Sequence, residues 1–567
     1  MPKMTGGQFI AETFKQYGVT HVFFMPVITV RALKEMERLG IRRIMTRSEK
    51  AAAYMADGYA RATKRAGICM SQSVGAFNLA AGLQDPYLAS SPVIAITGRR
   101  PQYQQLRHAY QEVDHMAPFS AVTKYNNVVA SLEQLPFSLR QAFRVATSGN
   151  PGPVHLDLEG FIGHGIAETE ADFEVIAEES FISIPPFRPA PERERIQDVI
   201  SAIRHAKRPV LVAGGGVTHS SAQQEVVAIA EKLSIPVATS LNGRGAIPED
   251  HPLSVGVVGH YSRWSANQVV GEADLVIYVG SRTGSVVTNE WTVPAPGTRI
   301  VQVDIEPNEL GRNYPTQIAV QADARAFLRD LIATATDTDR GSNKAWAVHV
   351  KEIVNAWHDE NSTHFNSDAI PMRPERLCKE VTEHLPSDAV LVADTGHVGI
   401  WSGTVMEFRH PDQRYIRCAG SLGWGFPGAM GVKCAVPDRP VICFVGDGGI
   451  WYHMTELDTA VRYGINTVTV INNNHSLNQE QSVNESVYGK QTAGSDALWI
   501  FKDTDFAKMA ESFGAFGITV NRPGEFEGAM DQALASGKPA IIDVKTDISV
   551  IAAPAQPNAY GNDPRCL

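Results

Sequence analysis

A βαβ pattern with polar residues at the end of each strand is the feature that most constrains the fold. An apolar run at 441–445 ends in Gly446-Asp447-Gly448, and after a helical stretch a second apolar run at 467–471 ends in Asn472-Asn473-Asn474. The pattern places Asp447 and Asn474 at the carboxyl ends of neighbouring parallel strands, where open α/β sheets bind ligands. Carboxylate, amide and carbonyl oxygens are suitable ligands for Mg²⁺, and water and phosphate oxygens complete its coordination shell. The segment therefore predicts a clamp for a magnesium diphosphate; the alternative is a plain β-turn before a polar loop.

Apolar runs alternate with helical stretches along the whole chain, which is typical of an α/β fold. Because 567 residues are too many for one core, we expect three doubly wound parallel-sheet domains, at residues 1–170, 190–345 and 367–550, and a tail at 551–567. Helices are expected at 4–17 and 49–63. The expected strands are 19–25, 68–71, 93–96, 152–158, 209–212, 236–239, 275–279, 299–303, 389–392, 441–445, 467–471 and 540–544.

The composition excludes several classes of partner. The chain has 51 basic and 61 acidic residues, a net charge of −10 and no basic block, which argues against nucleic acid. The six cysteines are scattered without a CxxC pair. We find no leader sequence and no apolar run of membrane-spanning length. The expectation is a cytoplasmic protein that acts on small molecules and binds neither a membrane nor nucleic acid.

A second polar position opens an alanine-rich helical stretch. Residues 46–61 read TRSEKAAAYMADGYAR, with Glu49 near the start of the helix. The helix dipole by itself favours an acid at this place. Taken alone, Glu49 could therefore serve the helix rather than any chemistry.

The two segments together resemble the thiamine diphosphate enzymes, in which GDG is followed by about 25 residues and NN, and in which an acid precedes small residues and Gly-Tyr-Ala-Arg. From residue 4 to about 550 the chain resembles the acetolactate synthase, benzaldehyde lyase and 2-hydroxyacyl-CoA lyase group. This implies a pyrimidine-binding, a central and a diphosphate-binding domain, in that order. It also implies that Asp447, Asn474 and the backbone carbonyl of Ser476 ligate Mg²⁺. Glu49 would exchange a proton with the cofactor's aminopyrimidine ring.

The resemblance implies further contacts with the cofactor. Leu422 matches the bulky apolar wedge that bends thiamine diphosphate, although by residue type it could be a core leucine. His397 lies in a loop that often contacts the diphosphate. The further residues placed at the cofactor are Asn78, Gly396, Gly420, Gly446, Gly448 and Gly449.

The residues that contact the substrate are expected to come from both the first and the third domain. Gln111 matches a glutamine beside the reacting carbon and could hydrogen-bond a substrate carboxylate or a developing alkoxide; the alternative is a surface glutamine. Glu480 either faces the substrate or is solvated. The other residues expected to line the pocket are Val27, Ile28, Tyr110 and Val483. Acetolactate synthases have Pro-Gly-Gly where this chain has Pro26-Val27-Ile28, which leaves the acyl donor open.

The predicted function is that of a thiamine diphosphate-dependent carboligase or decarboxylase acting on a 2-keto acid such as pyruvate. One alternative is a lyase that cleaves a 2-hydroxy ketone or a 2-hydroxyacyl-CoA, and a more remote one is a non-catalytic binding relative. Glycine-rich turns at 214–216 and 280–284, with 304–306, are positions where relatives hold FAD or ADP. The resemblance also implies a homodimer or homotetramer with active sites at the subunit interface.

Overall fold

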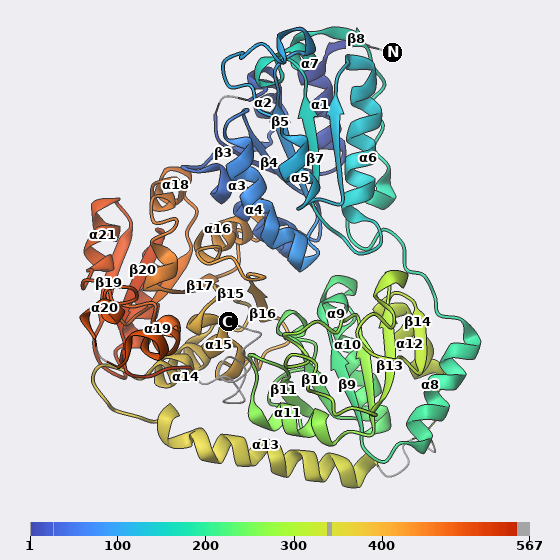
Figure 1. The fold of residues 1–567 in the computed structure, drawn as a ribbon, viewed down its shortest axis with the longest axis vertical. Coiled ribbons are helices and arrows are strands. Elements are labelled where there is room, and N and C mark those ends of the chain that lie inside the picture. Colours follow the sequence, from blue (N-terminus) through green and yellow to red (C-terminus); the bar gives the residue numbers. More distant parts are fainter. Residues whose placement is uncertain (1, 27, 337–338, 340–342, 491, 553–567) are drawn as a thin grey trace.

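Three parallel six-stranded sheets, each flanked by helices, build the part of the chain that the structure describes (Figure 1). The computed structural model describes residues 2–26, 28–336, 339, 343–490 and 492–552. The sheet orders are β3-β2-β4-β5-β7-β6, β11-β10-β9-β12-β13-β14 and β16-β15-β17-β18-β20-β19. The first and third sheets thus share one topology, whereas the central sheet has the order of dinucleotide-binding folds. The expected α/β class with three parallel-sheet domains is confirmed.

The first domain is wound from short buried strands and covering helices. Its strands are β2 (His21–Phe24), β3 (Arg42–Met45), β4 (Gly67–Ser71), β5 (Val93–Gly98), β6 (Tyr125–Val129) and β7 (Val154–Leu158). Its helices are α1 (Gly6–Gln16), α2 (Val30–Arg38), α3 (Glu49–Thr63), α4 (Ala76–Ala89), α5 (Met116–Ser120), α6 (Leu135–Thr147) and α7 (His164–Glu168). A small antiparallel pair, β1 (Lys3–Thr5) and β8 (Glu170–Asp172), ties its two ends together.

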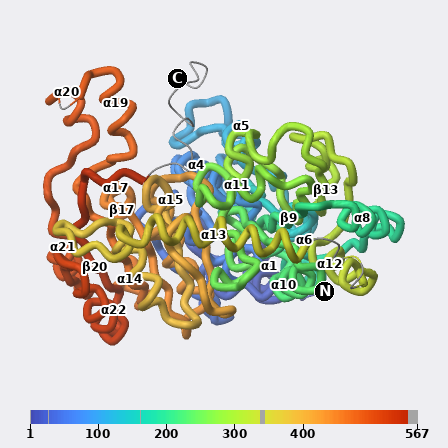
Figure 2. The backbone as a smooth tube through the Cα atoms, turned by 90° about the horizontal axis from the view of Figure 1, so that it is seen from below, coloured from blue at the N-terminus to red at the C-terminus, as the bar shows by residue number. Residues whose placement is uncertain are grey.

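The central domain has its own core and connects to the third domain through a long helix. Its strands are β9 (Pro209–Ala213), β10 (Val237–Thr239), β11 (Ser254–Val257), β12 (Leu275–Val279), β13 (Arg299–Asp304) and β14 (Ile318–Gln321). Its helices are α8 (Arg193–His205), α9 (Gly215–Ser220), α10 (Gln223–Leu233), α11 (Trp264–Glu272) and α12 (Ala324–Thr334). Helix α13 (Asn343–Phe365) then crosses to the third domain (Figures 1 and 2).

The third domain repeats the topology of the first. Its strands are β15 (Val390–Ala393), β16 (Arg414–Arg417), β17 (Val441–Gly446), β18 (Val468–Asn473), β19 (Phe516–Val520) and β20 (Ala540–Lys545). Its helices are α14 (Pro374–His384), α15 (His397–Thr404), α16 (Gly425–Ala435), α17 (Asp447–Ile450), α18 (Glu456–Tyr463), α19 (Gln481–Tyr488), α20 (Ala493–Asp496), α21 (Phe506–Ser512) and α22 (Phe526–Ala535). None of the described helices combines the length and the apolar character needed to cross a bilayer.

The first and third domains share one hydrophobic core across α3 and α16, which lie side by side in Figure 1. Glycines allow the close approach, because a Cβ on Gly58 would lie 2.0 Å from the carbonyl oxygen of Gly428. The indole N–H of Trp424 donates to the buried Asp57 carboxylate at 2.9 Å. The alanine-rich character of α3 thus serves helix packing between two domains.

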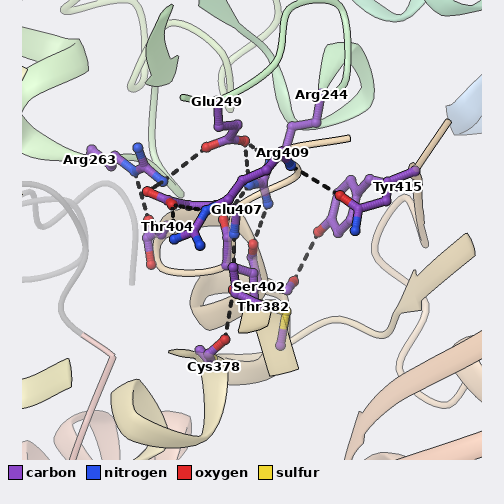
Figure 3. Close-up of polar contacts among 12 residues, drawn as sticks. Arg244, Glu249, Arg263, Cys378, Thr382, Ser402, Thr404, Glu407, Arg409 and Tyr415 are labelled. Carbon is purple, nitrogen blue, oxygen red and sulfur yellow. Dashed lines mark hydrogen bonds and ion pairs between the residues drawn. The ribbon is translucent and has the colours of Figure 1, made fainter. Parts of the chain in front are cut away.

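A buried charge cluster joins the central domain to α15 (Figure 3). Glu249 accepts hydrogen bonds from Arg244 and Arg263, each at 2.9 Å, and both guanidiniums are almost fully buried. Arg244 also donates to the carbonyl of Ser402, and Arg263 donates to that of Thr404 at 2.8 Å. The two arginines therefore satisfy carbonyl groups at the C-terminal end of α15, where the helix cannot satisfy its own.

Candidate cofactor site

The carboxyl ends of β17 and β18 form the edge that the sequence predicted. The two strands pair in parallel with Gly446 opposite Asn472, so Asp447 and Asn474 follow directly at the same edge of the sheet. A cavity of about 350 Å³ opens there. The expected site residues that line it are Gly396, His397, Gly420, Leu422, Gly446, Asp447, Gly448, Gly449, Asn474, Ser476 and Glu480.

Asp447 is a buried carboxylate at the start of α17. Burial raises its pKa to about 7, although the backbone N–H groups of Gly448 and Ser476 donate to it and partly offset that effect. Among the described residues, no arginine, lysine or histidine forms an ion pair with Asp447. A bound cation would stabilise the charged form of a carboxylate buried in this way.

The three asparagine side chains near Asp447 differ in whether their oxygens already have hydrogen-bond partners. Asn473 donates to Asp543 at 2.7 Å and so serves the sheet. Asn474 accepts from the Ser476 hydroxyl at 2.9 Å. The Oδ1 atom of Asn472, which also lines the cavity, is buried without a hydrogen-bond partner in the described part of the chain. This residue was missed as a candidate, although the sequence places it in the same amide run.

These donors fit Mg²⁺ better than a softer metal. The cavity offers a carboxylate, amide oxygens and backbone carbonyls, which are hard oxygen ligands. No cluster of three or more His, Cys, Asp or Glu side chains suited to a metal occurs within the described residues. A metal here would therefore depend on amide, carbonyl, water and phosphate oxygens around one carboxylate.

The glycines after Asp447 pack tightly against neighbouring side chains. A Cβ on Gly448 would lie 2.4 Å from Leu477, and a Cβ on Gly449 would lie 2.6 Å from an oxygen of Asp394. Gly396, which also lines the cavity, has φ +71°, which disfavours other residues. The backbone around the cavity therefore needs glycine at these three positions.

His397 begins α15 at the cavity wall. Burial lowers the pKa of this histidine to about 4, so the ring is neutral at pH 7. Its Nδ1 lies 2.6 Å from the Asn478 side-chain oxygen, which requires the proton on Nδ1 and leaves Nε2 as an acceptor.

The Leu422 segment is held by two buried carboxylates that sequence reasoning missed. Asp394, at the end of β15, accepts from the backbone N–H of Gly423 at 2.9 Å. Asp85, from α4 of the first domain, accepts from the N–H groups of Ala419 at 2.9 Å and Ser421 at 3.2 Å. Leu422 is only partly buried and lines the cavity. It is therefore no ordinary core leucine.

Glu49 is the first residue of α3 and lies against the N-terminal end of α4. Asn78 donates to Glu49 Oε2 at 3.1 Å. A Cβ on Gly75 would lie 2.5 Å from Glu49 Oε1, so only glycine fits beside that oxygen. The structure thus brings Glu49 and Asn78 together, but neither lines the 350 Å³ cavity within one chain.

The expected substrate residues are not gathered in one chain. Ile28 is buried in the core of the first domain, and Tyr110 is exposed. Gln111 is half-buried on the same loop as Tyr110. Val483 is exposed on α19, whereas Glu480 lies at the cavity. Val27 lies outside the described residues.

A second cavity, of about 530 Å³, lies where the three domains meet. The glycine-rich turns of the central domain line it, including Gly215, Gly216 and Gly280. Cationic groups from three domains also line it, namely Arg61, Lys64, Arg282 and Arg417. Burial raises the pKa of Asp304, on the same wall, to about 6.

Comparison with known proteins gives matches to three family models. Residues 4–117 match the N-terminal TPP binding domain of thiamine pyrophosphate enzymes, 196–331 match their central domain and 394–544 match their C-terminal TPP binding domain. The chain is 33% identical to a probable acetolactate synthase large subunit of Methanocaldococcus jannaschii, over 96% of this chain and 92% of that protein. It is 32% identical to the corresponding protein of Methanococcus aeolicus, over 91% and 87%. It is 28% identical to the acetolactate synthase large subunit of Haemophilus influenzae, over 98% and 97%.

Proposed function

The chain belongs to the thiamine pyrophosphate enzyme family, and from that premise we propose that it is a thiamine diphosphate-dependent carboligase acting on pyruvate, like the acetolactate synthases to which it is similar. The reaction joins the acyl part of one 2-keto acid to the carbonyl carbon of a second and releases CO₂. The observation that carries the proposal is the cavity at the ends of β17 and β18, with Asp447, Asn474 and the glycine turns on its walls.

In this proposal the third domain holds the diphosphate through Mg²⁺. Asp447, Asn474 and the backbone carbonyl of Ser476 are the metal ligands, which agrees with their burial and with the lack of an ion pair at Asp447 in the part of the chain that the structure describes. When bound, thiamine diphosphate supplies a carbon nucleophile and an electron sink for the electrons that decarboxylation releases. Leu422, whose neighbours Ser421 and Gly423 donate to Asp85 and Asp394, would contact the bound cofactor.

Glu49 is the residue that exchanges the activating proton. Its Oε2 already accepts from Asn78, so Oε1, beside Gly75, is the atom that would share a proton with the pyrimidine ring. Gln111, whose Nε2 donates to the Tyr110 hydroxyl at 3.3 Å, would orient the 2-keto acid by donating its second amide N–H to a substrate oxygen. A positioned acid or base of this kind contributes about 10²- to 10⁴-fold to the rate.

The two alternatives are less well supported. All the relatives described above are acetolactate synthases, established or probable, so the lyase that cleaves 2-hydroxy ketones or 2-hydroxyacyl-CoA is not favoured. A non-catalytic relative would have no need for Glu49 together with Asp447 and Asn474. The test is to incubate the protein with thiamine diphosphate, Mg²⁺ and pyruvate and to measure CO₂ and 2-acetolactate, with benzoin and a 2-hydroxyacyl-CoA as competing substrates. Cleavage of either competitor without carboligation of pyruvate would reject the proposal.

The proposal includes a homodimer or homotetramer, in which the first domain of one subunit completes the cavity of another. Glu49 and Asn78 do not line the cavity of their own chain. Apolar side chains are exposed on the two surfaces that this subunit contact would join. They are Val74 and Phe77 near Glu49, and Val487 and Tyr488 on α19. The segment with α19 and α20 stands out from the third domain (Figure 2). Sedimentation at several protein concentrations, with activity measured in parallel, tests this part.

The cavity between the domains suits a nucleotide such as FAD or ADP. Glycine turns after β9 and β12 line it, and Lys64 and Arg282 supply positive charge, whereas Arg61 is paired with Asp57 and Asp85. The strand order of the central sheet agrees with this class of ligand. Chromatography of the small molecules released by denaturation tests whether a nucleotide is bound.

The proposal also includes a cytoplasmic location, because the five described cysteines are free thiols.

A further inference from the structure

A buried chain of polar groups connects Asp157 to the loop that carries Gln111. His115 Nδ1 lies 3.1 Å from both oxygens of Asp157. On its other side, His115 Nε2 lies 3.2 Å from the hydroxyl of Ser73. That hydroxyl donates to the backbone carbonyl of Gln111 at 2.5 Å. Asp157, His115 and Ser73 are all buried.

The sheet of the first domain places these groups in register. Ser71 of β4 lies opposite Thr97 of β5, and Thr97 lies opposite Asp157 of β7. Ser73 follows β4 by two residues, and Thr97 donates to Asp157 at 2.8 Å. The chain of hydrogen bonds therefore starts at the rigid carboxyl edge of the sheet and ends in a loop.

Proton counting gives the direction of the chain. The single proton of the Ser73 hydroxyl goes to the Gln111 carbonyl, so the hydroxyl can only accept from His115. The ring of His115 lies between the two groups, with Nε2 towards the Ser73 hydroxyl and Nδ1 towards the Asp157 carboxylate. Burial alone would raise the pKa of Asp157, but hydrogen bonds and charge from His115 outweigh it and lower that pKa. One buried imidazole thus connects the carboxylate at the sheet to the hydroxyl beside the loop.

The loop between β5 and α5 is held mainly by polar contacts. Arg100 donates to the carbonyl of Tyr110, and Glu112 accepts from the backbone N–H groups of Leu106 and Ala109. The apolar side chain of Leu106 is 97% exposed and does not pack into the core. Gln111 has φ +61°, a left-handed conformation that a non-glycine residue keeps only when its surroundings enforce it. The contact from Ser73 meets the carbonyl of this same residue.

The array does not have the properties of a hydrolase triad. Ser73 is 2% exposed, so no substrate carbonyl reaches its hydroxyl. Its proton is donated to Gln111 rather than to the histidine, which is the reverse of what an activated serine nucleophile needs. The geometry instead fits the support of a neighbouring residue.

We propose that Asp157, His115 and Ser73 are positioning residues that fix Gln111 on the substrate side of the cofactor and thereby set the selectivity among 2-keto acids. The inference rests on the proposed function, because it takes Gln111 to contact the substrate. The three residues touch neither substrate nor cofactor. Their effect reaches the reaction only through the backbone of Gln111.

The first test compares Ser73→Ala with Ser71→Ala, using the cofactor-loaded full chain. Ser71 is a matched control, because it is buried on the adjoining strand and its hydroxyl has no partner in the described residues. We expect Ser73→Ala to lower kcat/KM for pyruvate about five- to tenfold, the loss of roughly one hydrogen bond. Affinity for thiamine diphosphate, measured by calorimetry, stays within about twofold. Ser71→Ala should change neither. Equal effects of the two variants would overturn the inference.

The second test asks whether Ser73 acts through Gln111. In a Gln111→Ala background, adding Ser73→Ala should cause no further loss of kcat/KM, and the ratio of rates with pyruvate and 2-ketobutyrate should be unchanged by it. Coupling of this kind is what a double-mutant cycle detects. Additive losses would mean that Ser73 acts on general stability, and the inference would fail.

A readout independent of catalysis separates this inference from the proposed function. Arg107 is exposed on the loop, and trypsin should cleave after it several-fold faster in Ser73→Ala than in wild type or Ser71→Ala. Unchanged cleavage would overturn the positioning role even in an active enzyme. If wild type does not ligate pyruvate, the proposed function falls; selectivity is then measured on whichever substrate is turned over, and the cleavage rates still decide the positioning role.

Discussion

The carboxylate of Glu456 accepts a hydrogen bond of 3.0 Å from the backbone N–H of Ser48, across the boundary between the third and the first domain. Ser48 is the N-cap of α3, whose first residue is Glu49. Glu456 also accepts from the N–H of Arg47 at 2.9 Å. The third domain thus sets the start of the helix that carries the proposed activating acid.

Glu456→Gln should therefore weaken the placement of Glu49. The amide keeps one acceptor but brings an N–H group close to the N–H donors of residues 47 and 48, so we expect kcat to fall about three- to tenfold. Steady-state kinetics with pyruvate measures it. Asp458→Asn is the control, since Asp458 pairs with Arg47 at an exposed site and such pairs contribute little. Equal losses in both variants would contradict the prediction.

Glu49→Gln should remove the proton exchange but not the cofactor. We expect turnover to fall at least about 100-fold, because a positioned acid or base contributes about 10²- to 10⁴-fold. The rise in melting temperature on adding thiamine diphosphate and Mg²⁺ should persist. The exposed Glu37→Gln serves as the control. Turnover near that of wild type would remove Glu49 from the mechanism.

Asp447→Asn should raise the Mg²⁺ concentration needed for half-maximal activity at least about tenfold, because the carboxylate is the proposed ligand with a formal charge. Wild type dialysed against a chelator should lose activity and regain it with Mg²⁺. The exposed Asp531→Asn is the control. A metal dependence identical to that of wild type would disprove the ligand assignment.

Asp394→Asn should change how stability depends on pH. Burial raises the pKa of Asp394 from 3.8 to about 7, so the folded state binds this proton more tightly than the unfolded state. The contribution is fully present below about pH 4 and is lost as the pH rises to about 7. Asparagine has no such proton. Relative to wild type, the variant should gain about 1.4 kcal/mol of stability for each pH unit between about pH 4 and pH 7, and nothing further above pH 7. Urea midpoints of the cofactor-free proteins measure this, and parallel pH profiles would contradict it.

Glu249→Gln should destabilise the contact between the central and third domains. It leaves Arg244 buried without a counter-charge and leaves Arg263 with only its 3.8 Å ion pair to Glu407; breaking a buried pair in this way costs about 3–5 kcal/mol. Urea unfolding measures the loss. The surface variant Asp198→Asn, from a pair with about half of each side chain exposed, should cost less than about 1 kcal/mol. A similar small cost for Glu249→Gln would refute the expected loss.

Much of the fold could be predicted because buried parallel strands appear as continuous apolar runs. The expected strand 275–279 and helix 49–63 have the predicted bounds, and the others agree to within a few residues. Edge strands were missed. β3 contains two arginines and β14 alternates buried and exposed residues, so neither appears as an apolar run. The predicted domain limits stay predictions, and the tail at 551–567 lies almost wholly outside the described residues.

The site could be predicted only where it depends on segments that are close in sequence. Asp447 and Asn474 meet because consecutive strands with a helical crossover pair in parallel. Asp85 could not be found in this way, because it reaches Ser421 across 336 residues of sequence. The role of Ser73 depends on a hydrogen bond to a loop carbonyl, which no side-chain pattern reveals. Tertiary hydrogen bonds to the backbone leave no trace in the sequence.

The core shared by α3 and α16 bears on how the chain is made. Trp424 and Asp57 are 367 residues apart, so a ribosome must complete the whole central domain before the surfaces of α3 can be covered. Until then the alanine face of α3 is open to other nascent chains, and contacts of such long sequence separation form slowly. Synthesis at low temperature or with chaperones should therefore raise the yield of native protein more than added cofactor does.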